Sequence, residues 1–245
     1  MIHLIRKLEN FAPLSPDEKQ ALTGAVNAVR KYGPHEDLIQ QGVPSDGVKI
    51  ILEGLACRYK VLPDGRRQIV GYFVPGDICD LGAFLLKRMD HSIGTLGPVE
   101  AAILPQESLL ASTDRFPNLT RALWWSTLVE ESITREWIVN VGHRTALERM
   151  AHLLCEMFTR LQTVGLTNGN HCELPLTQIE LADTLALSAV HVNRTLMEMR
   201  RVHLVTFQYR HLVIHDPDML RSVAGFDPAY LNTDIHGPAY RSARV

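Results

Sequence analysis

The stretch LTQIELADTLALSAVHVNRTLMEMRR, from Leu176 to Arg201, decides how the C-terminal part of the chain folds. Thr177 and Glu180 have the T-x-x-E spacing of a capping box, which predicts that a helix begins at this point. The letters ALS then leave three residues for a corner, and Ser188 is a favourable N-cap for a second helix. Two helices joined this tightly cross steeply, so the start of the second helix is prominent enough to enter a major groove of DNA.

The second helix of this pair divides its side chains between two faces. Val192, Leu196 and Met199 recur at helical spacing and form the face that can pack inward. The segment LVTFQYRHLVIHD that follows alternates around QYRH, which predicts a short hairpin, or wing, beside the helix. A helix pair without a nucleic-acid role is the alternative, but two caps, a tight corner and a wing in succession favour a DNA-binding unit. The side chains outside the inward face are Ala189, His191, Asn193, Arg194, Met197 and Glu198.

Residues from about Tyr32 to Leu110 have the pattern of short strands. The runs GVKIILEG, LACRYKVL and RQIVGYFV are rich in Val, Ile and Tyr and are separated by turn residues. Asp64-Gly65 lies between two of these runs and is a strong hairpin signal. Several short strands at this spacing predict a small barrel or jelly roll. A helix from about Ser15 to Arg30, with Pro16 as its first residue, is predicted to precede them.

The pattern changes to helical from about Phe116. Leu123, Leu128, Ile133, Trp137 and Val141 recur at intervals of four or five residues. Such an apolar stripe on a long helix is typical either of a protein core or of a dimer seam. A break is expected at glycine 142, after which ALERMAHLLCEMFTRL predicts a separate amphipathic helix and TVGLTNGNHCEL a turn-rich linker.

The composition of the 245 residues is ordinary for a globular protein, with a net charge of −2. That charge argues against non-specific coating of nucleic acid, but not against docking through a small basic surface. The apolar runs are too short for a transmembrane helix or a signal peptide, so we expect a cytoplasmic protein without membrane association. The four cysteines have no CxxC or CxxxH grouping and are expected to be small buried residues, not metal ligands.

The run from Leu176 to Phe207 resembles the winged helix-turn-helix of the Crp/Fnr family of bacterial transcription regulators. ILEG, PDGRRQIVGYFVPGDICDLGAFL and ERMAHLL occur upstream in the family's order, so the resemblance covers roughly residues 10 to 220. It implies an α+β protein that acts as a homodimer on palindromic double-stranded DNA, with RNA polymerase as a partner and with the two reading helices about one DNA turn apart. The implied parts are a cyclic-nucleotide-binding-type β-roll of jelly-roll form with N-terminal helices (1–115), a dimerisation helix (116–142), a winged helix-turn-helix (143–224) and a C-terminal tail (225–245).

The resemblance also places the DNA contacts. The family's S-R-E-T-V-x-R recognition run falls on residues 188–194, where Arg194 matches and is expected to donate a bidentate contact to guanine. Ala189 and Val190 replace the usual Arg and Glu, so the preferred half-site should differ, with Val190 able to touch a thymine methyl. The full set of expected DNA-contacting residues is Thr177, Gln178, Ser188, Ala189, Val190, His191, Asn193, Arg194 and Met197.

The sequence does not identify the effector that the β-roll binds. Members that bind cyclic AMP pair an Arg with the cyclic phosphate and a Glu with the ribose, whereas this chain has His91-Ser92 and Asp80 at the corresponding places. A His and a shorter carboxylate weaken such a site, which disfavours cyclic AMP. An iron–sulfur cluster is disfavoured because no Cys precedes Cys57, while His35 and His91 leave haem as an alternative. The expected effector pocket consists of Asp80, Leu81, His91, Ser92, Thr134 and Arg135, without a metal or cofactor.

Two rival functions remain. A cupin-type enzyme would need clustered His and carboxylate ligands, but the strand region has only His35 and His91, far apart, and no nucleophile motif is present. A cyclic-nucleotide-binding-like regulatory module acting on a protein partner would show no salt-dependent DNA binding. The sequence therefore predicts a non-enzymatic, DNA-binding transcription regulator with an unidentified effector, and leaves activation or repression open.

Overall fold

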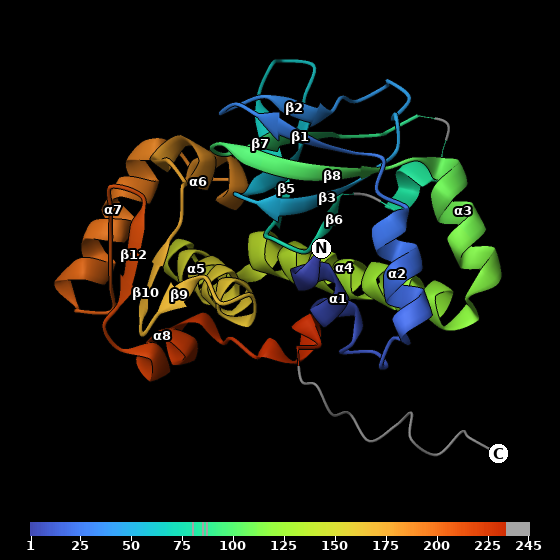
Figure 1. The fold of residues 1–245 in the computed structure, drawn as a ribbon. Helices are drawn as coiled ribbons and strands as arrows, with labels where there is room; N and C mark the ends of the chain where they lie inside the picture. Colours follow the sequence, from blue (N-terminus) through green and yellow to red (C-terminus); the bar gives the residue numbers. More distant parts are fainter. Residues whose placement is uncertain (80, 85, 87, 234–245) are drawn as a thin grey trace. The chain divides into compact units, whose positions relative to one another are not determined.

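A computed structural model of the chain describes residues 1–233 except 80, 85 and 87. The chain divides into two compact units (Figure 1). The first unit consists of residues 1–56 and 73–132 with the described residues after Tyr230, and the second of residues 57–72 and 133–230. Among the helices described, none is long and apolar enough to cross a membrane.

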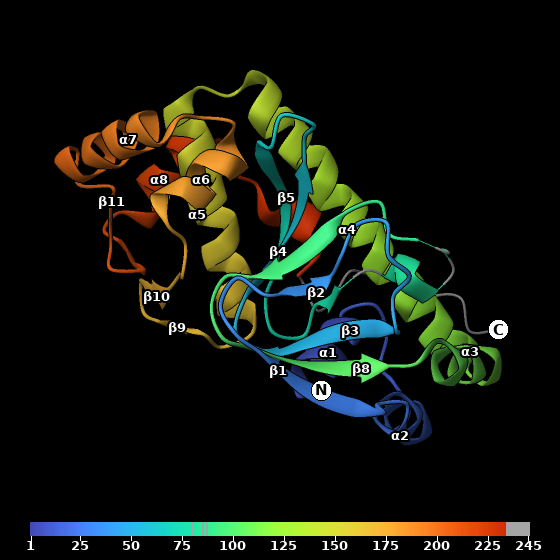
Figure 2. The same ribbon diagram turned by 90° about the horizontal axis from the view of Figure 1, so that it is seen from above.

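The first unit is built around short antiparallel strands, as the alternation of apolar and turn residues predicted. One sheet has the order β1-β8-β3-β6, and Figure 2 shows β1, β8 and β3 side by side. The other has the order β2-β7-β4-β5, in which the β4–β5 hairpin carries residues 57–72 of the second unit. The strands are β1 (Ala28–Tyr32), β2 (Asp37–Ile39), β3 (Val48–Glu53), β4 (Ala56–Val61), β5 (Arg67–Phe73), β6 (Ile78–Cys79), β7 (Ser92–Thr95) and β8 (Val99–Leu104).

The core of the first unit joins these strands to four helices. Ile50, Ile51 and Phe73 from the strands are buried in one cluster with Leu4 and Leu22 from the first two helices. Burying this many aliphatic and aromatic side chains is the main favourable free-energy contribution to such a fold. The helices are α1 (Ile2–Leu8), α2 (Pro16–Gly24), α3 (Gln106–Arg115) and the start of α4 (Pro117–His143), with a 3-10 turn η1 (Leu81–Phe84).

Turn chemistry fixes the strand ends at the expected places. Gly65 has φ +84° in the Asp64-Gly65 turn, where the Leu62 amide donates to the Arg66 carbonyl at 2.8 Å. Gly54 has φ +82°, and a Cβ on it would collide with the Pro98 carbonyl oxygen, so this tight position requires glycine. The hairpin predicted at Asp64-Gly65 is therefore confirmed.

Two boundaries predicted for the N-terminal part were wrong. The helix expected from Ser15 to Arg30 begins as predicted, with Ser15 as N-cap and Pro16 first, but it ends at Gly24. Ala28–Tyr32 is a strand because its backbone pairs with β8, and such a ladder overrides local helix propensity. The strand region also ends earlier than expected, at Leu104, because the residues after Pro105 form α3.

The second unit combines helices with one small sheet. In Figure 1, α6 and α7 adjoin, with β10 and β12 beside them and α8 below. The sheet order is β11-β12-β10-β9, all antiparallel. The elements are the end of α4, α5 (Ala146–Thr163), β9 (Thr167–Asn168), β10 (His171–Glu173), α6 (Gln178–Leu185), α7 (Ala189–Arg201), β11 (Val205–Gln208), β12 (His211–Ile214), α8 (Pro217–Ala224) and the 3-10 turn η2 (Pro228–Leu231).

Three expectations for the C-terminal half need correction. Glycine 142 lies inside α4, and the break comes after His143, where Thr145 caps α5. The TVGLTNGNHCEL segment contains the β9–β10 hairpin, because its two-residue Gly169-Asn170 turn lets both strands extend the wing sheet. The tail expected from 225 is not free at its start: Phe226 is buried and the Tyr230 hydroxyl donates to Glu156 at 2.8 Å, while residues 234–245 lie outside the described residues.

A buried polar cluster holds the second unit together where α4 ends. Glu156 is fully buried and accepts hydrogen bonds from Trp137 Nε1 at 3.0 Å and from Tyr230. Arg160 lies 3.4 Å away on the same helix. Burial raises the pKa of Glu156, while Arg160 acts in the opposite direction. These hydrogen bonds to Glu156 fix which faces of α4 and α5 pack together. Any other packing would break them and leave a buried polar group without a hydrogen-bond partner.

Candidate DNA-binding site

The first helix of the pair, α6, begins where the capping box predicted. The Thr177 hydroxyl accepts from the Glu180 amide at 3.2 Å, and Glu180 Oε2 accepts from the Thr177 amide at 2.7 Å. Both backbone amides are thus hydrogen-bonded, which stabilises the start of the helix by roughly 1 kcal/mol. The box leaves Gln178, the first helical residue, exposed beside Thr177.

The corner between α6 and α7 consists of Ala186, Leu187 and Ser188, as expected. Ala186 has the left-handed φ of +53°, and the Leu187 amide donates to the Ala182 carbonyl at 3.2 Å. Ser188 accepts from the His191 amide at 3.2 Å and so caps α7. A left-handed Ala is strained, so the packing on either side must maintain this corner.

The two faces of α7 are those that the spacing predicted. Val192, Leu196 and Met199 are buried against the unit's core. Val190, by contrast, is 72% exposed at the start of the helix, which is a large exposure for an aliphatic side chain. The other exposed residues of this face are Ala189, His191, Asn193, Arg194, Met197 and Glu198.

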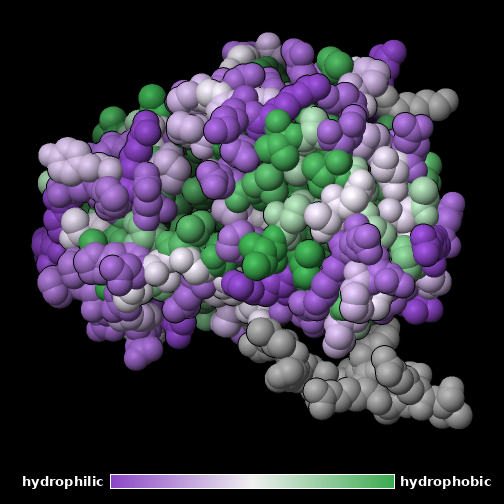
Figure 3. All heavy atoms as spheres, in the orientation of Figure 1, coloured by the Kyte–Doolittle hydropathy of each residue, from purple (hydrophilic) through white to green (hydrophobic). Residues whose placement is uncertain are grey.

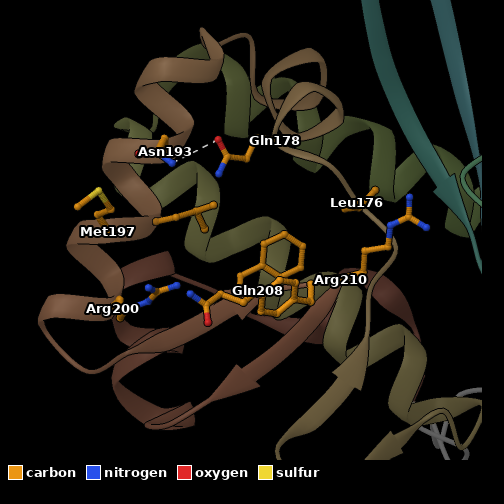
Figure 4. A pocket seen from close by; sticks show the side chains of 10 residues that line it. Leu176, Gln178, Asn193, Met197, Arg200, Gln208 and Arg210 are labelled. Atoms are coloured by element: carbon orange, nitrogen blue, oxygen red, sulfur yellow. Dashed lines mark hydrogen bonds between the residues drawn. The ribbon is translucent and has the colours of Figure 1, made fainter.

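The wing adds a second wall. Its turn residues, Tyr209 and Arg210, have φ of +51° and +66°, which is the type I′ geometry of a two-residue hairpin. A groove of about 500 Å³ separates α7 from this wing (Figure 4). We call it the α7–wing groove; its lining residues are Leu176, Gln178, Asn193, Leu196, Met197, Arg200, Phe207, Gln208, Tyr209 and Arg210.

Two polar pairs lie along the α7–wing groove. Asn193 Nδ2 donates to Gln178 Oε1 at 3.4 Å. With its amide oxygen turned to the guanidinium, Gln208 accepts from Arg200 Nη2 at 2.7 Å. The sequence pattern had singled out Gln178 and Asn193 but missed Arg200, Gln208 and the wing-turn residues. The QYRH break in alternation was the one signal for Gln208 and the wing-turn residues, and no sequence pattern marked Arg200.

The charge and polarity of this surface suit a polyanion. The α7 helix carries three Arg and one Glu, a net charge of +2 in a chain whose total is −2. Its N-terminus supplies unpaired backbone amides, which favour phosphate oxygens. In the view of Figure 3, α7 and the wing, at the far left, present a mostly hydrophilic surface. Such a surface can neutralise phosphates while exposed side chains reach base edges.

The residues expected to hold an effector are distributed over both units. His91 and Ser92 are buried side by side in the first unit, where His91 Nδ1 donates to Asp90 at 2.8 Å and Ser92 Oγ accepts from the Gln41 amide at 3.0 Å. Leu81 is half-buried in η1. Thr134 and Arg135 are exposed on α4, in the second unit, and Asp80 lies outside the described residues.

The chain matches two family models, each over one of these regions. The cyclic nucleotide-binding domain model matches residues 29–115, and the Crp-like helix-turn-helix domain model matches residues 148–223. The first match covers the strands from β1 to β8 with α3, and the second covers α6, α7 and the wing.

Whole-length similarity to regulators agrees with these matches. A probable transcriptional activator of Rhizobium leguminosarum bv. viciae is 31% identical over 192 residues, which is 78% of this chain and 79% of the relative. The transcriptional activatory protein AadR of Rhodopseudomonas palustris is 29% identical over 221 residues, 90% of each chain. The structure of FixK2 from Bradyrhizobium japonicum shares the fold with a TM-score of 0.73 and 24% identity, covering 80% of this chain and 96% of that one. With a cyclic-nucleotide-binding-type β-roll followed by this helix pair and wing, the chain belongs to the Crp/Fnr family of DNA-binding transcription regulators.

Proposed function

We propose that the protein binds palindromic DNA as a homodimer and places the first turns of α7 in two successive major grooves. The observation that carries this proposal is the exposed face of α7, which combines Arg194 with apolar and amide side chains at the prominent end of a capped helix. A helix in this position reads base edges, and two-fold symmetry sets the half-sites about one helical turn apart. Acting on chromosomal DNA, the protein would reside in the cytoplasm and would act by binding, not by catalysis.

The α4 helix supplies the surface for a second copy. It is 27 residues long, and Trp124 and Ile138 are 66% and 65% exposed on it. Leu128 and Val139 are exposed as well, so the apolar side chains recur along the helix. Large exposed apolar side chains in a row favour association, and a parallel pair of such helices has the symmetry of a palindrome. We assign dimerisation to residues 116–142 on this basis.

The exposed residues of α7 suggest which bases are read. Arg194 presents the planar fork that matches the O6 and N7 acceptors of guanine. Val190, exposed and apolar, suits a thymine methyl, and Ala189 leaves room beside it. Ser188 and Thr177, at the N-terminal caps of α7 and α6, are placed for phosphate contacts together with His191 and the wing.

The β-roll is proposed to bind an effector other than cyclic AMP. Ser92 already accepts a hydrogen bond from Gln41, and its neighbour His91 donates to Asp90, whose carboxylate would repel a cyclic phosphate at this place. An effector can shift the protein toward its DNA-binding conformation only if it binds that conformation more tightly than the inactive conformation. By analogy with relatives named as transcriptional activators, RNA polymerase is the proposed partner at the promoter.

Selection of bound sites from random duplex DNA tests the proposal. The purified protein is mixed with the pool, with and without small molecules extracted from cells, and bound duplexes are sequenced. We expect an inverted repeat with half-site centres about ten base pairs apart. A pool that gains no common motif under either condition contradicts the proposal, and so does a single direct motif without two-fold symmetry.

A further inference from the structure

The amide pair between α6 and α7 is placed where a base-reading group is needed. Gln178 is the first residue of α6 and Asn193 lies one turn into α7, so the contact joins the two helices across their corner (Figure 4). Asn193 Nδ2 donates to Gln178 Oε1 at 3.4 Å, and both side chains are exposed. Leu181 on α6 and Val192 on α7 are both fully buried, so each helix is anchored in the core of the unit.

This contact pairs the Asn193 amide with the Gln178 amide in one of two possible senses. An Asn amide carries two N–H donors and a carbonyl acceptor, and Gln178 occupies only one of the donors. The two amides can also pair in the reverse sense, with Gln178 Nε2 donating to Asn193 Oδ1, so the observed sense is held only when Gln178 Nε2 is engaged by another acceptor. In the observed sense, the second N–H and the carbonyl of Asn193 stay available as a donor and acceptor side by side. Adenine offers the complementary edge in the major groove, with N7 as acceptor and N6 as donor.

The same contact gives Gln178 a second task. Its Oε1 is engaged with Asn193, so its Nε2 group is left with two donors at the exposed start of α6. The first helix of such a pair crosses the DNA backbone, where phosphate oxygens accept from amide groups. A phosphate at Nε2 would in turn hold Oε1 toward Asn193, so the two contacts support each other.

We propose that Asn193 is a specificity-determining residue that reads one adenine in each half-site, and that Gln178 is a positioning residue which orients its amide and donates to a phosphate. This inference rests on the proposed function. It assigns a base to Asn193 separate from the guanine assigned to Arg194.

Three variants separate reading from positioning. Asn193→Ala removes the reader. Gln178→Met removes the acceptor that orients Asn193 at nearly constant length, whereas Gln178→Glu keeps an acceptor but loses the phosphate donor. Gln162→Ala is the control, because it removes an exposed amide side chain of the same unit, on α5 and outside the α7–wing groove. All these side chains are exposed, so the variants are expected to fold, which a thermal unfolding curve checks.

The measurement is the dissociation constant of each variant for the selected site and for every single base-pair substitution of one half-site. Asn193→Ala should lose roughly 5- to 100-fold of discrimination at one A·T pair and keep the guanine preference. Gln178→Met should lose discrimination at the same pair, while Gln178→Glu should keep it and bind all sequences more weakly. The inference is overturned if Asn193→Ala leaves every base preference intact, or if Gln178→Met and Gln178→Glu behave alike. A wild-type protein without any base preference would overturn the proposed function as well, so the two failures are distinguishable.

Discussion

Arg194 is the side chain on which the proposed guanine contact depends. It is exposed on α7, next to Asn193 and on the opposite side of the helix from buried Val192 and Leu196. A bidentate base contact and a phosphate contact have different consequences for sequence preference, even when they contribute similar affinity. The distinction is therefore measurable with one variant.

Arg194→Ala is expected to weaken binding to the selected site by about 1–3 kcal/mol and to abolish the preference at one G·C pair. Titration of the site and of its variants at that pair, at one salt concentration, measures both effects. Arg201→Ala serves as the control, because it removes the same charge from the far end of the helix. Equal weakening on every sequence would make Arg194 a phosphate contact.

His152 is a second residue with a measurable signature. It is 1% exposed, with Phe226 and Tyr230 packed against its ring and Glu136 Oε1 3.2 Å from Nε2. Burial, and next the charge of Arg144, lower its pKa from 6.5 to about 4, although Glu136 acts in the opposite direction. The unfolded chain therefore binds a proton between pH 6.5 and 4 that the folded chain does not, so stability falls as the pH drops through this window.

His152→Phe should remove that dependence. Between pH 7 and pH 5, the wild type should lose on the order of 2 kcal/mol more stability than the variant. Unfolding of both proteins in urea at the two pH values measures the difference, and exposed His171→Gln is the control. If His152→Phe and the wild type lost the same stability on acidification, His152 would not be buried as a neutral ring.

At the scale of elements, the helix α4 carries the proposed dimer contact. Its exposed apolar side chains include Trp124 and Ile138, fourteen residues or two heptads apart. A charge at position 138 would be buried against the second copy. The free-energy cost of burying it would exceed the free energy gained by association.

Ile138→Glu is expected to give a monomer in light scattering and to reduce DNA affinity roughly 100-fold or more, because one molecule no longer binds both half-sites. Met219→Glu is the matched control, since it places the same charge on a comparably exposed apolar side chain of α8. A dimer that persists in Ile138→Glu, or a monomeric wild type, would rule out this seam.

The elements also show how far the sequence could be interpreted. Local chemistry was sufficient for the caps at Thr177 and Ser188 and for the Asp64-Gly65 turn, because each signal lies within a few residues of the structure that it specifies. Pairing over long distances could not be predicted: the start of β1 was mistaken for helix because its partner β8 lies some seventy residues away. For the same reason, the contact of Gln178 with Asn193 and the groove beside the wing emerged only from the fold.

Within the second unit, contacts distant in sequence were the least predictable. Arg67, on the β4–β5 hairpin, forms an ion pair at 2.8 Å with Asp183 on α6, 116 residues away. The Gln68 amide donates to the Thr184 carbonyl at 3.0 Å. No periodicity or motif marks these residues, because each is an ordinary polar side chain in its own segment.

At the scale of the whole molecule, we propose that a symmetric pair of chains inserts two α7 helices into neighbouring major grooves. The exposed face of α7, the exposed apolar side chains of α4 and the family to which the chain belongs all support this arrangement. It is independent of which effector the β-roll binds, because that ligand only biases the population of the DNA-competent arrangement.

Methylation interference on a selected site tests this claim most directly, because methylated guanine N7 projects into the major groove where Arg194 is proposed to bind. We predict that methylation blocks binding in two clusters about ten base pairs apart, related by two-fold symmetry, and that Arg194→Ala loses sensitivity at one guanine in each cluster. Interference confined to a single cluster, or binding that is indifferent to guanine methylation throughout the site, would contradict the proposed insertion of two α7 helices.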